Sequence, residues 1–404
     1  MSTVLFSDVG QIVTCESADE RSVRARHALA AEDGCIAAIG PPEELVARYP
    51  RAERVRCAGG VITPGFVDSH THAVFGCWRA GEYALRARGV PYMEIARQGG
   101  GINASVRDLR ARSEDELVQL TRARLREMLR QGITTAEVKS GYGLRTEDEL
   151  KSLRVVKRLN EEGPLELVPT FMGAHEFPAE TRGRRSDYVH LVIQEMIPAV
   201  AEAKLAVFCD VFLEPGVFTA VEARRILEAG LARGLLPKLH ADELEPSGGA
   251  ELAVALGAVS ADHLGRISDA GIHALAHSQT VATLLPATLF FLGHKQYAPG
   301  RRLLDAGATV ALATDFNPGS APSPNMALVL TLACSHMGFD PLEALLAATA
   351  GGARALRIED GRGALRPGAP ADLIVWGVSD YREIPYRYGV NMIRGVWKRG
   401  VRVV

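Results

Sequence analysis

The 404-residue sequence has no long apolar run, no closely paired cysteines and no excess of charge of either sign. No stretch approaches the roughly 20 apolar residues of a membrane-spanning helix, so we expect no membrane segment. Lysine and arginine number 46 against 48 acidic residues, which argues against nucleic acid or an anionic membrane as the main partner. The N-terminus lacks a basic start followed by an apolar stretch, so we expect no signal peptide.

The six cysteines are scattered, without the spacing of a zinc ribbon or a disulfide framework. They predict reduced thiols and a cytoplasmic protein. The amino-acid composition, 47% hydrophobic and 23% charged, is ordinary for one large globular domain plus a small one. Arg182, Arg184 and Arg185 form a short basic stretch, which we expect to be solvated surface.

Both ends of the chain are rich in β-prone residues. Asp33-Gly34 separates two such runs near the N-terminus, and Arg399-Gly400 separates two near the C-terminus, which are hairpin signals. Neither end alone is large enough to bury a core. We therefore predict that residues 1–60 and 361–404 combine into one small composite β-sandwich domain.

The middle of the chain, residues 61–360, alternates apolar β-prone runs with amphipathic helical stretches. Such alternation predicts a parallel sheet covered by helices, and eight units over about 300 residues favour a (β/α)8 TIM-type barrel over an open sheet. The predicted strands are Gly65–His70, Ile133–Val138, Glu166–Met172, Val207–Leu213, Leu236–His240, Val259–His263, Thr280–Leu284 and Thr309–Ala313.

Three local signals refine this prediction. Ser113 with Glu116, and Thr146 with Glu149, have the spacing of a capping box at a helix N-terminus. The run of three glycines at 99–101 is expected to be a mobile loop beside the site, without a helix start directly after it. The strand interiors are expected to be apolar, with polar groups confined to the strand ends.

Polar side chains gather where the predicted strands end, which is the active-site face of such a barrel. His70 and His72 point the same way from strand one, so both imidazoles can reach one metal ion. His240 ends strand five and Asp315 follows strand eight. Three imidazoles and one carboxylate suit zinc and also iron, so these residues do not identify which metal is bound.

A metal held in this way lowers the pKa of a bound water to about 7. Glu243 follows the ligand His240 by three residues and lies near enough to accept a proton from that water. A second metal usually needs a bridging group, which is often a modified lysine after strand four. Here strand four ends in Glu214 and has no lysine, so we favour one metal. Lys139, after strand two, is expected to be a surface or structural lysine.

Four stretches resemble the amidohydrolase superfamily in sequence and order, and the resemblance covers nearly the whole chain: His70–His72, His240–Glu243, Ser260–His263 and Ala313–Asp315. Three more resemble the branch that hydrolyses the cyclic amide of 4-imidazolone-5-propanoate to N-formimidoyl-L-glutamate in histidine degradation: Glu137–Gly143, Phe171–Pro178 and Asp315–Ser320.

The resemblance implies one Zn²⁺ or Fe³⁺ per subunit, held by His70, His72, His240 and Asp315. From the chemistry of these residues we predict catalysis by Glu243, His263 and Asp315, with a structural role as the alternative for His263. The resemblance places substrate contacts on Arg79, Tyr142, His175, Glu243, Asn317, Gly319 and Ser320.

These implied roles fit the chemistry of a substrate that carries a propionate. The fork of Arg79 matches a carboxylate with two hydrogen bonds. Tyr142 and His175 are expected to donate hydrogen bonds to that carboxylate or to the ring. His263 is expected to stabilise the oxyanion that forms on the ring carbonyl, and Asp315 to shuttle a proton to the leaving nitrogen.

Two other functions use much the same residues. A deaminase of an aromatic base shares the metal set, but a neutral base offers no carboxylate to Arg79, Tyr142 and His175. A metal-free structural relative would have lost ligands that this chain keeps. We therefore expect a small-molecule partner with a carboxylate, and a homodimer is compatible with the sequence.

Overall fold

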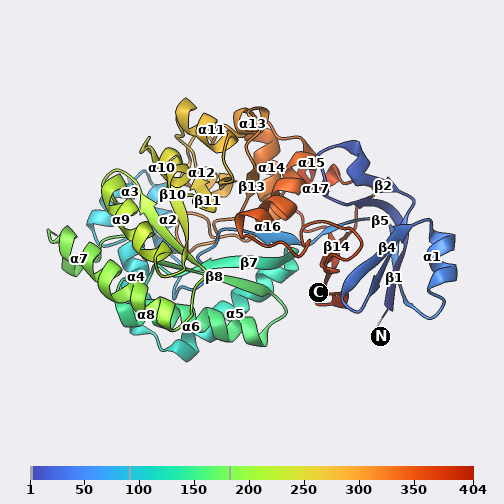
Figure 1. Ribbon diagram of the computed structural model, residues 1–404, viewed down its shortest axis with the longest axis horizontal. Coiled ribbons are helices and arrows are strands. Elements are labelled where there is room, and N and C mark those ends of the chain that lie inside the picture. The colour runs from blue at the N-terminus through green and yellow to red at the C-terminus, as the bar shows by residue number, and fades with distance from the viewer. Residues whose placement is uncertain (1–2, 91, 182) are drawn as a thin grey trace.

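The computed structural model describes residues 3–90, 92–181 and 183–404, so Met1, Ser2 and the predicted surface residue Arg182 lie outside the described residues. Figure 1 shows a helix-covered barrel on the left and a smaller β-domain on the right, where both ends of the chain lie. The two parts are joined by strand β5, Glu53–Pro64, which runs from the small domain almost directly into the first barrel strand.

Within the described residues, eight parallel strands form the barrel in the order in which they occur along the chain. This confirms the predicted fold class, and each strand begins and ends within two residues of its predicted bounds. The strands are β6 Phe66–Asp68, β7 Ile133–Lys139, β8 Glu166–Ala174, β9 Phe208–Leu213, β10 Leu236–Ala241, β11 Ser260–His263, β12 Val281–Leu284 and β13 Val310–Leu312.

The barrel is closed by the segments that follow its first and last strands. The amide of Asp315 donates to the carbonyl of His70 at 3.0 Å, and the amide of His72 donates to the carbonyl of Phe316 at 2.9 Å. Two residues before His70, the Asp68 carboxylate accepts hydrogen bonds from the amide and hydroxyl of Thr314. Barrel closure therefore brings three of the four predicted metal ligands together.

Helices cover the outside of the barrel (Figure 1). The helix bounds are α2 Ala80–Ala87, α3 Tyr92–Arg97, α4 Ile102–Ala111, α5 Glu114–Arg130, α6 Thr146–Glu162, α7 Arg185–Leu191, α8 Ile197–Glu202, α9 Ala220–Leu231, α10 Gly249–Ala255, α11 Asp269–Ala276, α12 Pro286–Leu292, α13 Gly300–Asp305, α14 Met326–Met337, α15 Pro341–Leu346 and α16 Gly352–Ala355. Short 3₁₀ or π turns lie at Glu20–Ser22, Ala179–Thr181, Val192–Met196 and Ala347–Gly351.

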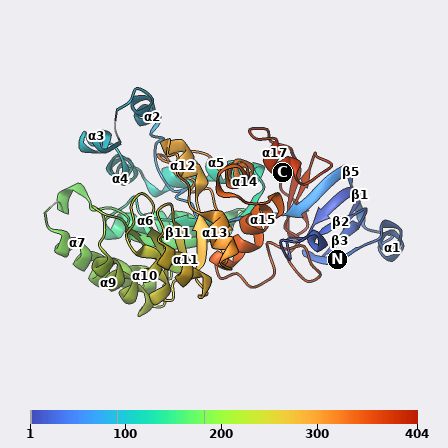
Figure 2. The ribbon, with the colours of Figure 1, turned by 90° about the horizontal axis from the view of Figure 1, so that it is seen from above.

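The local helix signals have mixed outcomes. The capping box of Ser113 and Glu116 at the start of α5 is confirmed. The one predicted at Thr146 is wrong, because Thr146 is already helical and the carboxylate of Glu149 accepts backbone hydrogen bonds from the preceding loop instead. The prediction that no helix follows the three glycines is also wrong, since α4 begins at Ile102, directly after Gly101. Gly101 is the N-cap residue of this helix and has a positive φ of 70°. Figure 2 shows α2, α3 and α4 standing out from one end of the barrel.

The small domain is one mixed sheet of eight strands drawn from both ends of the described chain. Its elements are β1 Thr3–Val13, β2 Val23–Ala25, β3 Ala28–Glu32, β4 Cys35–Gly40, β5 Glu53–Pro64, β14 Leu373–Trp376, β15 Ile393–Lys398 and β16 Val401–Arg402, with helix α1 Pro42–Arg48. Helix α17 Glu383–Tyr386, between β14 and β15, packs against α14 of the barrel. Both predicted hairpins are confirmed. The sheet curls over its core, so that Phe6 of β1 meets Trp397 of β15 edge to face at 5.1 Å.

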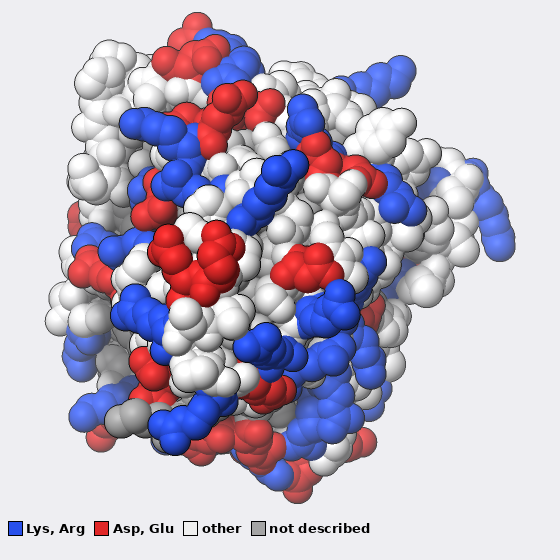
Figure 3. All heavy atoms as spheres, turned by 90° about the vertical axis from the view of Figure 1, so that its right-hand side faces the viewer, with Lys and Arg blue, Asp and Glu red and all other residues white. Residues whose placement is uncertain are grey.

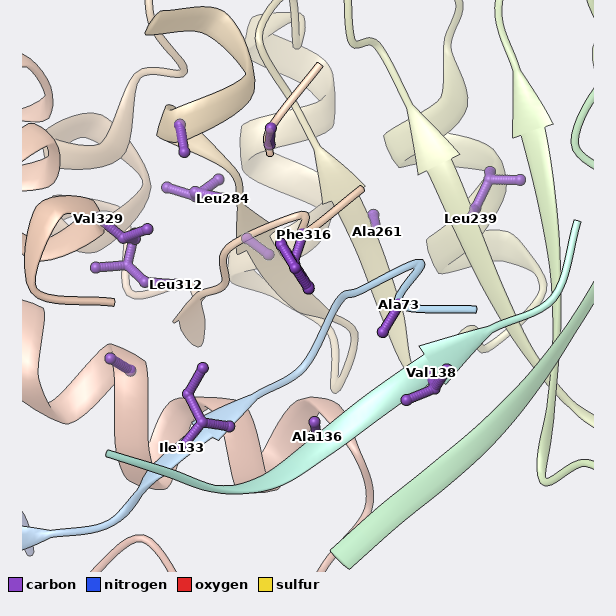
Figure 4. Packing of buried hydrophobic residues seen from close by; sticks show 14 of the residues in the cluster. Ala73, Ile133, Ala136, Val138, Leu239, Ala261, Leu284, Leu312, Phe316 and Val329 are labelled. Carbon is purple, nitrogen blue, oxygen red and sulfur yellow. The ribbon is translucent and has the colours of Figure 1, made fainter. Parts of the chain in front are cut away.

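The barrel core has an apolar outer layer and a charged interior. Val138, Leu239 and Ala261 belong to the apolar cluster between strands and helices (Figure 4). Successive side chains of a strand point to opposite faces, so their neighbours point inward. These include five fully buried charged residues, which makes the prediction of apolar strand interiors wrong: Glu137, Lys139, Asp210, Lys238 and Asp262.

The outer surface shows no segregation of charge on the face that Figure 3 presents, where acidic and basic side chains are interspersed over the small domain. In the predicted basic stretch, the side chain of Arg185 is 42% exposed and pairs with Glu222 at 2.7 Å. Among residues 3–90, 92–181 and 183–404, no helix is both long and apolar enough to cross a membrane.

Candidate metal centre and active site

The four predicted metal ligands meet at the carboxyl ends of the barrel strands. His70 and His72 follow β6, His240 lies in β10 and Asp315 follows β13. Asp315 Oδ1 lies 3.5 Å from His70 Nε2 and 3.6 Å from His72 Nε2, and His72 Nε2 lies 3.4 Å from His240 Nε2. In a tetrahedral site with bonds of about 2.0–2.1 Å, ligand atoms lie about 3.3–3.4 Å apart, so this set fits one metal ion.

The unpaired atoms of these side chains support the same fit. His70 Nε2 is buried and has no hydrogen-bond partner among the described residues. Its Nδ1 lies 2.7 Å from a carboxylate oxygen of Asp262, so the proton sits on Nδ1 and the lone pair on Nε2 faces the centre. Burial lowers the pKa of His70 and of His72 well below the usual value, which keeps both imidazoles neutral, as metal ligands must be.

A second group, His70 with Glu137 and Asp262, also brings three ligand atoms together. There, however, the ammonium groups of Lys139 and Lys238 lie 2.9 and 2.8 Å from Glu137 Oε2 and take the place of a metal. Of the two expectations for Lys139, the structural one is confirmed and the surface one is wrong, because Lys139 is fully buried. The arrangement supports a single metal ion.

Glu243 and His263 lie beside the ligand set. Glu243 follows β10, and its Oε2 lies 3.6 Å from His263 Nε2, at the end of β11. Burial, together with the carboxylates of Asp315 and Glu214, raises the pKa of Glu243 well above the usual value, which makes it a stronger base once it is ionised. Burial lowers the pKa of His263, so its imidazole is neutral.

A cavity of about 520 Å³ opens over this centre. Ten predicted site residues line it: His72, Arg79, Tyr142, His175, His240, Glu243, His263, Asp315, Asn317 and Ser320. His70 lies beneath the cavity wall, fully buried. Gly319 is outside the lining, but a side chain there would collide with Arg79, since a Cβ would lie 1.2 Å from its Nη2. Gly319 therefore makes room for the arginine.

Arg79 is the least satisfied cation of the cavity wall. Its side chain is only 8% exposed, and its Nε and Nη1 have no hydrogen-bond partner in the described part of the chain. The nearest acidic group is Glu82 Oε2, 3.8 Å from Nε. A buried guanidinium with unused donors is a site for an anionic group of a ligand.

His175 differs from its expected role as a hydrogen-bond donor. Its ring stacks on His72 at 5.0 Å, and its Nδ1 lies 3.1 Å from the carbonyl of Gly141, which can only accept. Burial lowers the pKa of His175 to about 3, so the ring is neutral and Nδ1 carries its one proton. Its Nε2 is therefore an acceptor, not a donor.

The loop of Asn317 and Ser320 is held by its own hydrogen bonds. Asn317 Oδ1 accepts from the amides of Gly319 and Ser320, both at 2.8 Å. Its Nδ2 donates to the carbonyl of Asp315 at 2.6 Å and to Ser320 Oγ at 2.9 Å. The Asn317 side chain thus shapes the cavity wall, and its direct contact with substrate stays a prediction.

Two buried glutamates organise the loops that carry the predicted site residues. Glu149 accepts hydrogen bonds from the amides of Gly141, Gly143 and Leu144, around Tyr142. Glu214 does the same for the amides of Glu243, Leu244 and Glu245, at 2.7–3.2 Å. Glu214 stands at the end of a predicted strand, but this role was not predicted. No pattern pointed to it, because the donors are backbone groups.

A model of the amidohydrolase family matches residues 61–403, and a model of an imidazolonepropionase-like composite domain of bacteria matches residues 28–52. The chain belongs to the amidohydrolase family. It is 50% identical to an imidazolonepropionase of Geobacillus kaustophilus, over 92% of this chain and 89% of that protein. It is 48% identical to an imidazolonepropionase of Myxococcus xanthus, over 98% and 96%. Within the amidohydrolases, it is a member of the imidazolonepropionase family.

Solved structures support the fold. An adenosine deaminase from Xanthomonas campestris with bound zinc superposes with a TM-score of 0.74 at 21% identity, covering 99% of this chain and 92% of that one. Aspergillus niger ochratoxinase superposes with a TM-score of 0.71 at 19% identity, covering 99% and 95%. At these identities the likeness shows the shared architecture alone.

Proposed function

We propose that this site hydrolyses the cyclic amide bond of 4-imidazolone-5-propanoate to N-formimidoyl-L-glutamate, a step of histidine degradation. Family membership supports the reaction. The observation that carries it is the pairing of a ligand set fit for one metal with a buried, unsatisfied Arg79 in the wall of the same cavity. A substrate that carries both a reactive ring and a carboxylate satisfies both parts.

His70, His72, His240 and Asp315 would hold the metal ion, which supplies hydroxide at neutral pH by lowering the pKa of water to about 7. Zinc and ferric iron both suit this ligand set, and we propose one of the two per subunit. Elemental analysis of the purified protein separates them.

The chain's own residues would move the protons. Water adds to the ring carbonyl carbon, and the bond from that carbon to the ring nitrogen breaks. Glu243 accepts a proton from the water and passes it to the leaving nitrogen, for which its raised pKa suits it. His263, 3.6 Å from Glu243, would donate to the oxygen on which negative charge develops. Asp315 would assist the proton transfer.

The remaining residues would bind and orient the substrate. Arg79 would take the propionate with two hydrogen bonds. Tyr142 would donate a hydrogen bond to the carboxylate or to the ring. His175 would accept a hydrogen bond, through Nε2, from a ring N–H. The loop from Asn317 through Gly319 to Ser320 would complete the wall around the substrate.

We further propose that the protein acts in the cytoplasm, supported by six free cysteines, all within the described residues. The predicted homodimer stays a prediction, which analytical ultracentrifugation tests.

The test is to incubate the purified protein with 4-imidazolone-5-propanoate and identify the product by mass spectrometry. We expect gain of one water and formation of N-formimidoyl-L-glutamate without release of ammonia. The alternative, a deaminase of an aromatic base, is examined with a purine and pyrimidine panel. Ammonia from that panel, with no turnover of the imidazolone, would overturn the proposal.

A further inference from the structure

A cluster of five charged side chains fills the barrel directly beneath the metal ligands. Its members come from four of the eight barrel strands, and none has any exposed surface: Glu137 and Lys139 of β7, Asp210 of β9, Lys238 of β10 and Asp262 of β11. Burying charge is costly unless the groups are paired. Lys238 and His240 lie two residues apart on one strand and so face the same interior, one layer apart.

Two of the carboxylates contact ligand histidines from below. Asp262 Oδ2 lies 2.7 Å from His70 Nδ1, and Asp210 Oδ2 lies 3.0 Å from His240 Nδ1. The contact to His70 is a hydrogen bond, and because an ionised carboxylate can only accept, it places the ring proton of His70 on Nδ1 and leaves the lone pair on Nε2. The contact of Asp210 to His240 Nδ1 has ion-pair distance without hydrogen-bond geometry, so it bears on the orientation of that ring. The third imidazole, His72, has no such partner among the described residues; its Nδ1 is unpaired and its ring stacks on His175.

Lys139 joins the two carboxylates. Its Nζ lies 2.7 Å from Asp210 and 3.6 Å from Asp262. Burial opposes the charge of Lys139, but the surrounding carboxylates Asp210, Glu137 and Asp262 prevail and raise its pKa, so it stays an ammonium. In both carboxylates, the oxygen that contacts Lys139 is the same Oδ2 that contacts a ligand histidine.

We propose that Asp210 and Asp262 are positioning residues that hold the orientation of His240 and His70, with Asp262 also fixing the tautomer of His70, and that Lys139 couples the two carboxylates. This inference rests on the proposed metal-dependent function. It predicts that the affinity for the metal ion, rather than the contact with substrate, depends on these two carboxylates. Partners of this kind at metal sites typically contribute about 10- to 100-fold in metal affinity.

Glu137 provides a matched control. It is as buried as the two aspartates, carries the same charge and contacts the same Lys139, at 2.9 Å. The described hydrogen bonds of its side chain go to Thr170 and Lys238, and none goes to a ligand histidine. Glu137→Gln therefore removes one charge of the cluster without removing a contact to a metal ligand.

The experiment measures zinc affinity by competition with a chromophoric chelator, after metal removal, for Asp262→Asn, Asp210→Asn and Glu137→Gln. Circular dichroism and the Tm of the metal-free proteins establish that each is folded. We expect dissociation constants about 10- to 100-fold above wild type for the two aspartate variants and within about threefold for Glu137→Gln. With saturating zinc, KM should stay close to wild type in all three.

Wild-type zinc affinity in both aspartate variants would overturn the inference, and so would an equal loss in all three, which would indicate a general structural role. If an asparagine variant fails to fold, Asp262→Glu keeps the charge and displaces the oxygen, and the same loss of zinc affinity is expected. If wild-type protein binds zinc tightly but leaves the imidazolone intact, the proposed function fails while the zinc affinities still decide this inference.

Discussion

At the residue scale, the site is defined by atoms that find no partner within the described chain. His70 Nε2 and the guanidinium of Arg79 are buried donors and acceptors of this kind. Leaving such atoms unpaired costs free energy, about 1–3 kcal/mol each and more for charged groups, so their retention indicates a ligand that completes them. We expect a metal ion to complete His70 Nε2 and an anionic group of the substrate to complete the Arg79 guanidinium.

Arg79→Ala tests the anion site. We expect kcat/KM to fall by the equivalent of about 2–5 kcal/mol, as for one partner of a buried charge pair left alone. Because a remote group also orients the ring for attack, kcat should fall together with a rise in KM. Arg79→Lys should recover only part of the loss, since lysine lacks the fork.

The control is Arg86→Ala, which removes a cation from the same cavity wall, where the guanidinium lies over the ring of Phe291 at 4.8 Å. The decisive comparison uses a substrate analogue with an amidated propionate, which Arg79→Ala should barely distinguish from the true substrate. If Arg79→Ala still prefers the free carboxylate as strongly as wild type, another residue reads the propionate.

Glu243→Gln tests the base. Glutamine keeps the shape but cannot accept a proton, so kcat should drop by about 10²- to 10⁴-fold while the metal content stays unchanged. Stopped-flow rates and elemental analysis measure the two quantities. Glu245→Gln, two residues further on and exposed, is the control. Turnover within a few-fold of wild type in Glu243→Gln would remove Glu243 from the mechanism.

At the element scale, strands were easier to predict than the contacts between loops. Apolar runs predicted all eight barrel strands, and the motifs at the strand ends contain residues that line the cavity. The overall apolar character of each run concealed the charged residues that alternate with apolar ones along the strands. Lys238-Leu239-His240 alternates inward and outward, and that period of two placed Lys238 inside, beneath a ligand. Glu149 could not be predicted, since its partners are backbone amides.

Glu149→Gln tests whether this loop is held by one side chain. Glutamine keeps one acceptor oxygen, so at least one of the amides of Gly141, Gly143 and Leu144 loses its partner, at a cost of about 1–3 kcal/mol. The loop carries Tyr142 and orients His175, so we expect KM to rise by about tenfold or more with a smaller change in kcat. Glu147→Gln, exposed on the same helix, is the control; equal kinetics in both variants would contradict the account.

At the scale of the whole molecule, the small domain supports the strand that carries the first two ligands. Strand β14, from the C-terminal segment, pairs with β5, and the backbone carbonyl of Asp372 accepts a hydrogen bond from the amide of Gly65 at 2.9 Å. The proposed domain boundary at residue 60 falls inside β5, which continues to Pro64, so that only Gly65 separates it from the first barrel strand at Phe66. The composite domain followed from two β-rich ends; its curled sheet required long-range pairings that no local pattern encodes.

The central claim is that the four ligands hold a metal ion on which hydrolysis depends, and one measurement tests it most directly. The protein is treated with a chelator, its metal content is checked by elemental analysis, and turnover of 4-imidazolone-5-propanoate is followed before and after addition of Zn²⁺ or Fe³⁺. We predict that activity is lost with the metal and returns with at least one of the two ions. Activity that survives complete metal removal would contradict the account.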